Sequence, residues 1–190
     1  MPSRRRLLAT IGSASGVGIA GCLGGDDTPP EYPDITIEPE DSTRENVEFT
    51  ATVLRAFDNE APARIRIAFE NAGDERREFI FGPIQPFDIV RATRDGGDER
   101  LFLDPESGTE LWPSDDPRPD EPVGGCWKLT DDILPAIPDI TSGATLDPGE
   151  ELTNEYDVYA GPDGCLTVGE YRFGPPSDSY DWGLVVTLTD

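Results

Sequence analysis

The chain has 190 residues, with 39 aspartates and glutamates against 15 lysines and arginines, no histidine, and a net charge of −24. The lack of histidine excludes Ser-His-Asp and Cys-His catalysis and His-ligated metals, and with Met1 as the single methionine it also excludes a blue-copper centre. A chain this acidic is not expected to bind nucleic acid or an anionic membrane surface.

Residues 1–21 predict a signal peptide for export. Three arginines precede an apolar stretch over residues 7–20, which is too short to span a bilayer because spanning takes about 20 residues. A charged start and a short apolar run are typical of a cleavable signal. The pair Arg4-Arg5 resembles the twin-arginine signal, whose receptor reads those side chains. An ordinary secretory signal is the alternative.

Cys22 is the predicted site of lipid attachment. The segment Ile19-Ala20-Gly21-Cys22 resembles the lipobox of prokaryotic lipoproteins, in which small residues precede the cysteine that takes the lipid. The alternative is an ordinary signal followed by a stray cysteine. Gly, Asp and Pro dominate residues 23–33, so we expect residues 22–33 to be a lipidated cysteine with a flexible tether. The lipid would hold the protein on the extracytoplasmic face of the cell membrane.

Residues 34–190 predict one all-β domain. Short apolar runs alternate with period two, and Gly-, Pro-, Asn- and Asp-rich turns at 71–74, 95–98, 147–149 and 161–164 separate them. No segment has a helical period. The pattern favours an antiparallel immunoglobulin-like β-sandwich of about 8–9 strands. The expected strands cover residues 47–53, 65–69, 79–81, 87–91, 101–103, 126–129, 152–159, 171–173 and 182–188.

Two proline-containing segments interrupt this rhythm. Residues 104–124 hold five prolines and Trp112, and loops of this length are often functional, so Trp112 is a predicted contact residue. Residues 133–138 are apolar, but their prolines exclude a central strand. They either pack under the sheet or form an exposed contact surface, in which Leu134 and Ile137 would meet a partner.

Cys126 and Cys165 are predicted to form a disulfide. With Cys22 taken by lipid, they are the remaining cysteines, and an exported protein lies in an oxidising compartment. Free or metal-binding thiols are the alternative, although two cysteines without histidine make a poor zinc site.

No catalytic residue, metal site or cofactor is predicted. Residues 58–60 and 95–99 gather carboxylates in turns, where calcium is one interpretation and a solvated acidic turn the other. Adjacent acids such as Asp115-Asp116 are the residue type of a glycosidase. In a chain with 39 acids, however, their adjacency carries little information.

The acids are spread along the chain, and Lys128 is the single lysine. This composition resembles that of proteins from extreme halophiles, where molar salt screens charge repulsion. Together with the arginine pair and the lipobox, it indicates a haloarchaeal lipoprotein.

Half of the mature chain also resembles a known family. Residues 65–92 contain the turn NAGDE and the segment PFDIV, and residues 146–173 contain the turn LDPGE and the segment GEYRF. These motifs resemble the bacterial intracellular proteinase inhibitor (BsuPI-like) family, which implies an immunoglobulin-like sandwich and raises protease inhibition as an activity. The Pro-rich loop 104–124 and the cysteine pair lie outside that family's pattern.

The expected function is therefore a non-enzymatic binding domain for a protein or polysaccharide at the cell envelope. One alternative is a protease-inhibitor-like domain. Another is an accessory subunit of an envelope transport or respiratory complex.

Overall fold

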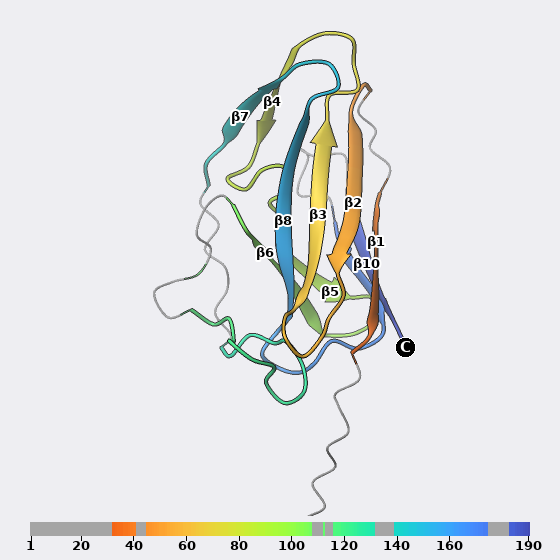
Figure 1. Ribbon diagram of the computed structural model, residues 1–190, viewed down its shortest axis with the longest axis vertical. Helices are drawn as coiled ribbons and strands as arrows, with labels where there is room; N and C mark the ends of the chain where they lie inside the picture. The colour runs from red at the N-terminus through yellow and green to blue at the C-terminus, as the bar shows by residue number, and fades with distance from the viewer. Residues whose placement is uncertain (1–31, 41–44, 108–111, 113–115, 132–138, 175–182) are drawn as a thin grey trace, which may run out of the picture.

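The computed structural model describes residues 32–40, 45–107, 112, 116–131, 139–174 and 183–190 (Figure 1). These residues form ten strands and no helix, which confirms the predicted all-β fold, and they contain no helix that could cross a membrane. Arg4, Arg5, Cys22, Leu134 and Ile137 lie outside the described residues. The strands are β1 (Asp34–Pro39), β2 (Glu48–Arg55), β3 (Ala63–Glu70), β4 (Arg77–Phe81), β5 (Arg91–Arg94), β6 (Arg100–Pro105), β7 (Ser142–Leu146), β8 (Glu151–Ala160), β9 (Gly169–Phe173) and β10 (Leu184–Thr189).

Eight strands form one antiparallel sheet in the order β1-β10-β9-β5-β6-β8-β3-β2. The sheet folds back on itself, so that β8, β3 and β2 make one layer and β6, β5 and β10 lie behind them (Figure 1). The edge strands β1 and β2 lie against each other, which nearly closes the sandwich. The strands β4 and β7 pair separately at one end of the long axis.

Strand β3 illustrates why these residues form a sheet. Ile65 and Ile67 point inward and are fully buried, while Arg64 and Arg66 alternate with them on the outer face. Arg64 stands opposite Asp157 of β8, and its Nε and Nη2 each donate to that carboxylate over 2.8 Å. The period-two pattern thus buries one face and pairs charges across the other.

Aromatic side chains join the parts of the core. The hydroxyl of Tyr156, on β8, donates to the carbonyl of Phe87 over 2.8 Å, which ties a loop to the sheet. The ring of Phe69, on β3, meets Phe79 and Phe81 of β4 edge-on, at centroid distances of 4.9 and 5.1 Å. This small cluster attaches the two-stranded sheet to the main one.

The predicted strands at 87–91 and 126–129 are wrong in most of their length. Residues 82–90 form a loop before β5, and residues 123–128 make only the bridges Val123–Cys126 and Lys128–Ala160. Phe87 and Leu129 are nevertheless buried, so loops supply part of the core and produce the same alternation as a strand. Conversely, β7 was not predicted because the sequence SGATL has few apolar residues.

Candidate functional site

The structure corrects the prediction that Trp112 contacts a partner. The side chain is only 5% exposed, and its ring centroid lies 6.3 Å from that of Phe102. Its indole Nε1 donates to Asp104 over 2.7 Å. A side chain this buried belongs to the core, because its ring packs on Phe102 of β6 and its indole N–H satisfies the buried carboxylate of Asp104.

The predicted disulfide is confirmed. Cys126 and Cys165 are bonded, with Cα atoms 5.7 Å apart, a usual separation for a disulfide. The bond joins the segment 116–131 to residues 161–166, which follow β8 and which we call the shared loop. The name reflects its position between two pockets.

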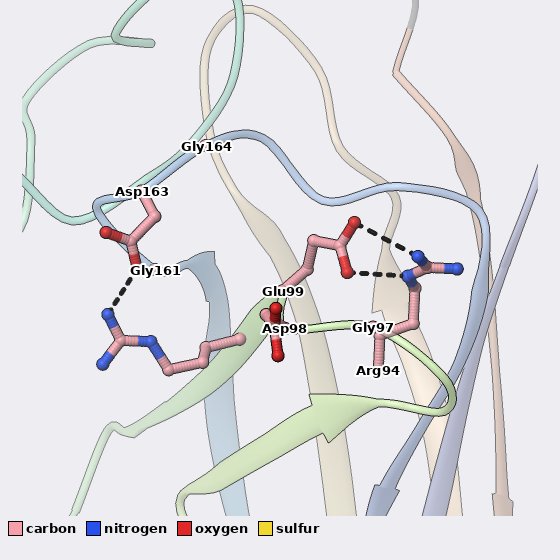
Figure 2. Close-up of a pocket in the computed structure, with 8 residues that line it drawn as sticks. Arg94, Gly97, Asp98, Glu99, Gly161, Asp163 and Gly164 are labelled. Atoms are coloured by element: carbon pink, nitrogen blue, oxygen red, sulfur yellow. Dashed lines mark hydrogen bonds and ion pairs between the residues drawn. The ribbon is translucent and has the colours of Figure 1, made fainter.

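The larger of these pockets, the charged pocket, has a volume of about 460 Å³. Figure 2 shows its walls, which come from the β5–β6 hairpin on one side and from the shared loop on the other. Five of the lining residues are charged and the rest are glycines. They are Arg94, Gly97, Asp98, Glu99, Arg100, Gly161, Asp163 and Gly164.

Ion pairs hold the side chains of the charged pocket in place (Figure 2). Arg94 donates from Nε and Nη2 to the two oxygens of Glu99, over 2.9 and 3.2 Å. Across the pocket, Nη2 of Arg100 donates to Asp163 over 2.6 Å. The two walls are joined at their base, because Gly161 N donates to the Arg100 carbonyl over 2.8 Å. Backbone pairing therefore fixes the base of the two walls, and ion pairs join four of the five charged side chains.

The hairpin turn depends on its glycines. Gly96 adopts a φ of 75°, which favours glycine. A Cβ on Gly97 would lie 2.1 Å from Glu99 Oε2 and 2.7 Å from Arg94 Nη2, so only glycine lets this ion pair close over the turn. Asp95 N donates to the carbonyl of Glu170 over 2.8 Å, which fastens the turn to β9.

The charges of the pocket persist over a wide pH range. Hydrogen bonds from Arg94 are the main reason why the pKa of Glu99 falls to about 2, and the same contact raises the pKa of Arg94. Both groups are therefore ionised at neutral pH. Asp98 is exposed, and within the described ranges its carboxylate makes no hydrogen bond or ion pair.

The smaller pocket, the apolar pocket, has a volume of about 100 Å³ and lies on the other side of the shared loop. Its aromatic lining includes Tyr32 and Phe57, whose rings stack with centroids 6.3 Å apart. The indole of Trp127 donates to the carbonyl of Asp58 over 2.7 Å. The remaining lining residues are Pro33, Gly125, Cys126, Cys165 and Leu166. This pocket seats the chain where it enters the first strand.

The two acidic turns considered for calcium have other contacts. Oδ1 of Asp58 accepts from the backbone N–H groups of Glu60 and Ala61, both over 2.7 Å, and these bonds lower the pKa of Asp58. Glu99 is held by Arg94. Across the part of the chain that the structure describes, no three metal-ligating side chains cluster as a metal site would require.

Sequence reasoning identified the turns at 95–98 and 161–164 but not the residues Arg94, Arg100 and Asp163 as members of a site. Each turn is acidic and glycine-rich, which was the available signal. The two turns lie together because β6 pairs with β8, which places Leu101 opposite Ala160.

Comparison of the chain with protein-family models, with curated proteins and with solved structures found no match. The resemblance to the intracellular proteinase inhibitor family therefore stays a prediction from the motifs.

Proposed function

We propose that this chain is a lipid-anchored domain on the extracytoplasmic face of a haloarchaeal cell membrane, and that it binds a ligand in the charged pocket without catalysing a reaction. The observation that carries the proposal is the pocket itself. It has a volume of about 460 Å³, and four of its five charged side chains are joined in ion pairs before any ligand arrives. Small-molecule sites usually measure about 300–1,000 Å³.

Preorganisation favours a binding role. Arg94 and Arg100 are each held by a carboxylate, and the disulfide at Cys165 restrains the shared loop. Ordering flexible side chains costs about 0.5–1.5 kcal/mol each on binding, and a site that is already ordered avoids much of this cost. The pocket is thus built to recognise a ligand.

The ionisation of Glu99 argues against acid–base catalysis in this pocket. A general acid or base works best with a pKa near the operating pH. The pKa of Glu99 lies near 2, mainly because of hydrogen bonds from Arg94. A carboxylate this acidic is a poor proton donor or acceptor at neutral pH, whereas it is well suited to hold an arginine in position.

The place of the pocket agrees with an anchored domain. Tyr32 and Pro33, the last residues of the predicted tether, line the apolar pocket, and the charged pocket lies across the shared loop from it. A ligand in the charged pocket would therefore bind at the end of the domain from which the tether leaves. Such a position suits a component of the envelope close to the membrane.

The test is affinity purification of the tagged chain from detergent-solubilised membranes in molar KCl, with identification of the molecules that co-purify. Gly164 lines the pocket and a Cβ there meets no atom within 4 Å, so a Gly164→Leu variant adds a bulky side chain to the lining without a clash at its Cβ. Gly143→Leu is the matched control on β7, where a Cβ makes only ordinary contacts of 3.6 and 3.8 Å. We expect Gly164→Leu alone to lose the ligand. Identical sets of molecules on all three proteins would overturn the proposal.

The anchor is tested separately with Cys22→Ser. We expect the unmodified chain in the membrane fraction, with lipid on the Cys22 peptide by mass spectrometry, and the variant in the soluble fraction. A variant that stays with the membrane would contradict a lipid anchor.

A further inference from the structure

We propose that the ligand of the charged pocket is a neutral, polyhydroxylated molecule, specifically a saccharide segment of an envelope glycan. This inference rests on the proposed binding function and adds the chemical class of the ligand. Four properties of the pocket lead to it: its lining, its mixture of donors and acceptors, its charge balance and its bare glycine surface.

The lining carries charged side chains and glycines only. Among its eight residues there is no aliphatic or aromatic side chain, only arginines, carboxylates and glycines. Its apolar surface therefore comes from the stems of the arginines and from glycine backbone. The polar groups that fix the orientation of a ligand here are guanidinium and carboxylate groups.

The hydrogen-bonding groups of the lining are of both kinds, donors and acceptors. A guanidinium only donates and a carboxylate only accepts, whereas a hydroxyl does both. Arg94 spends Nε and Nη2 on Glu99, and its Nη1 makes no hydrogen bond within the described part of the chain. Asp98 presents an exposed carboxylate on the same hairpin. A polyhydroxylated ligand can accept hydrogen bonds from the guanidinium groups of the lining and donate to its carboxylates.

The charge balance disfavours ions. Two arginines face three carboxylates in the lining, so the charge within the pocket itself disfavours an anion. A cation would lie among two guanidinium groups that are fixed in the walls. In molar salt the Debye length falls to about 3 Å, so a charged ligand would gain little from long-range attraction. A neutral ligand keeps its charge-assisted hydrogen bonds under these conditions.

The glycines supply the space. Gly97, Gly161 and Gly164 all line the pocket, so backbone rather than side chain forms much of its surface. A Cβ on Gly161 would lie 3.3 Å from that of Arg100, and one on Gly97 would collide with Glu99. These glycines let a bulky, rigid ring approach the charged groups closely.

The experiment is binding of the full exported chain, in molar KCl, to an array of neutral oligosaccharides built from hexoses and N-acetylhexosamines. The array also carries sulfated versions of the same sugars, and acidic and basic peptides. We expect binding to neutral oligosaccharides that is unchanged when KCl is raised severalfold. Free monosaccharides serve as competitors, and weak competition by them indicates a glycan segment rather than a single sugar.

Pocket variants locate the binding. Asp98→Ala removes the exposed acceptor, and Gly164→Leu places a bulky side chain in the pocket lining. Each variant should weaken saccharide binding about tenfold or more, and a tenfold loss corresponds to about 1.4 kcal/mol. Asp98→Asn keeps one acceptor oxygen and should lose less binding affinity than Asp98→Ala. Gly143→Leu, on the other pair of strands, should bind like the unmodified chain. Circular dichroism of each variant checks that it is folded.

Three outcomes would overturn the saccharide assignment. They are no binding of any neutral saccharide, binding by Asp98→Ala and Gly164→Leu as tight as that of the unmodified chain, or competition by monosaccharides as strong as by oligosaccharides. If a peptide or protein is bound instead and Gly164→Leu abolishes it, the pocket is still a binding site and only the saccharide class fails. If no molecule from the membrane extract or the array is sensitive to Gly164→Leu, the proposed function fails as well.

Discussion

The indole Nε1 of Trp112 donates a hydrogen bond to Oδ1 of Asp104 over 2.7 Å, and both residues are buried. The other oxygen of Asp104 accepts from Nη1 of Arg118 over 2.8 Å. One carboxylate on β6 thus holds two points of the Pro-rich segment. This arrangement places Trp112 in the folded core and holds Arg118 against β6.

Truncation of Trp112 should therefore destabilise the protein. Trp112→Phe removes one donor from a buried carboxylate and should lower the free energy of unfolding by about 1–3 kcal/mol. Trp112→Ala also leaves a cavity and should lower it by about 3–5 kcal/mol. Urea unfolding in molar KCl measures both, and a double-mutant cycle with Asp104→Asn isolates the hydrogen bond. An unchanged unfolding midpoint in Trp112→Ala would contradict the placement of Trp112 in the core.

The disulfide should stabilise the fold and the site together. Cys126 and Cys165 are 39 residues apart, and a loop of this length corresponds to about 4 kcal/mol in the chain-entropy account. The double variant Cys126→Ala with Cys165→Ala should lose this stability and, because the shared loop is released, bind the pocket ligand more weakly. Reductant should lower the urea midpoint of the unmodified chain and leave that of the double variant unaltered. Equal sensitivity of the two proteins to reductant would contradict a stabilising disulfide between Cys126 and Cys165.

Asn71 should tolerate no change to a carboxylate. Its side chain is fully buried, and Nδ2 donates to the carbonyls of Glu75 and Leu146 over 2.9 and 3.0 Å. Asn71→Asp replaces these donors with a buried charge facing two carbonyls, and should lower the free energy of unfolding by about 3 kcal/mol or more.

The matched control for Asn71 is Asn59→Asp, which adds the same charge at an exposed turn. Asn59 uses Oδ1 to accept from the hydroxyl of Tyr32, and aspartate retains that acceptor. Urea unfolding should give nearly the unmodified midpoint for Asn59→Asp. A similar loss in the two variants would mean that net charge, not the buried amide, controls the result.

Acid should weaken the Arg94–Glu99 pair over a defined range of pH. The pKa of Glu99 is about 2 in the folded protein against an ordinary value of 4.5, mainly because Arg94 hydrogen-bonds the charged form. A lowered pKa means that the pair stabilises the fold fully above about pH 4.5, and that this contribution is lost as the pH falls towards 2. In Glu99→Gln, unfolding stability should therefore depend less on pH in this range.

A carboxyl NMR titration checks the cause of this shift directly. Arg94→Gln should raise the pKa of Glu99 towards 4.5, because the first and largest contribution to its lowering is removed. A pKa that stays near 2 in Arg94→Gln would assign the shift to the backbone and Thr167 contacts instead.

The sequence predicted those parts of the fold that depend on local pattern. The alternation of Ile65, Ile67 and Phe69 with arginines indicated a strand, and the glycine-rich turns at 95–98 and 161–164 lie where the structure has them. The disulfide was predicted by counting, because two cysteines remained once Cys22 was assigned to lipid in a chain expected to be exported. The absence of histidine excluded whole classes of chemistry without any structure.

The sequence pattern failed to predict strands where the apolar alternation of the side chains does not coincide with backbone pairing in the sheet. Phe87 and Leu129 are buried by loops and were read as parts of strands, while the strand SGATL has too few apolar residues to be recognised. An apolar alternation reports burial on one side. It does not report whether the backbone finds a partner strand, which depends on the rest of the sheet.

By itself, the sequence determined the all-β class, the turns, the disulfide pair and the acidic surface, because each depends on composition or on neighbours along the chain. Only the tertiary structure decided that Trp112 is in the core and that Arg94, Glu99, Arg100 and Asp163 line one pocket. The physical reason is that β6 pairs with β8, and this long-range register brings together two turns that lie more than 60 residues apart in the chain.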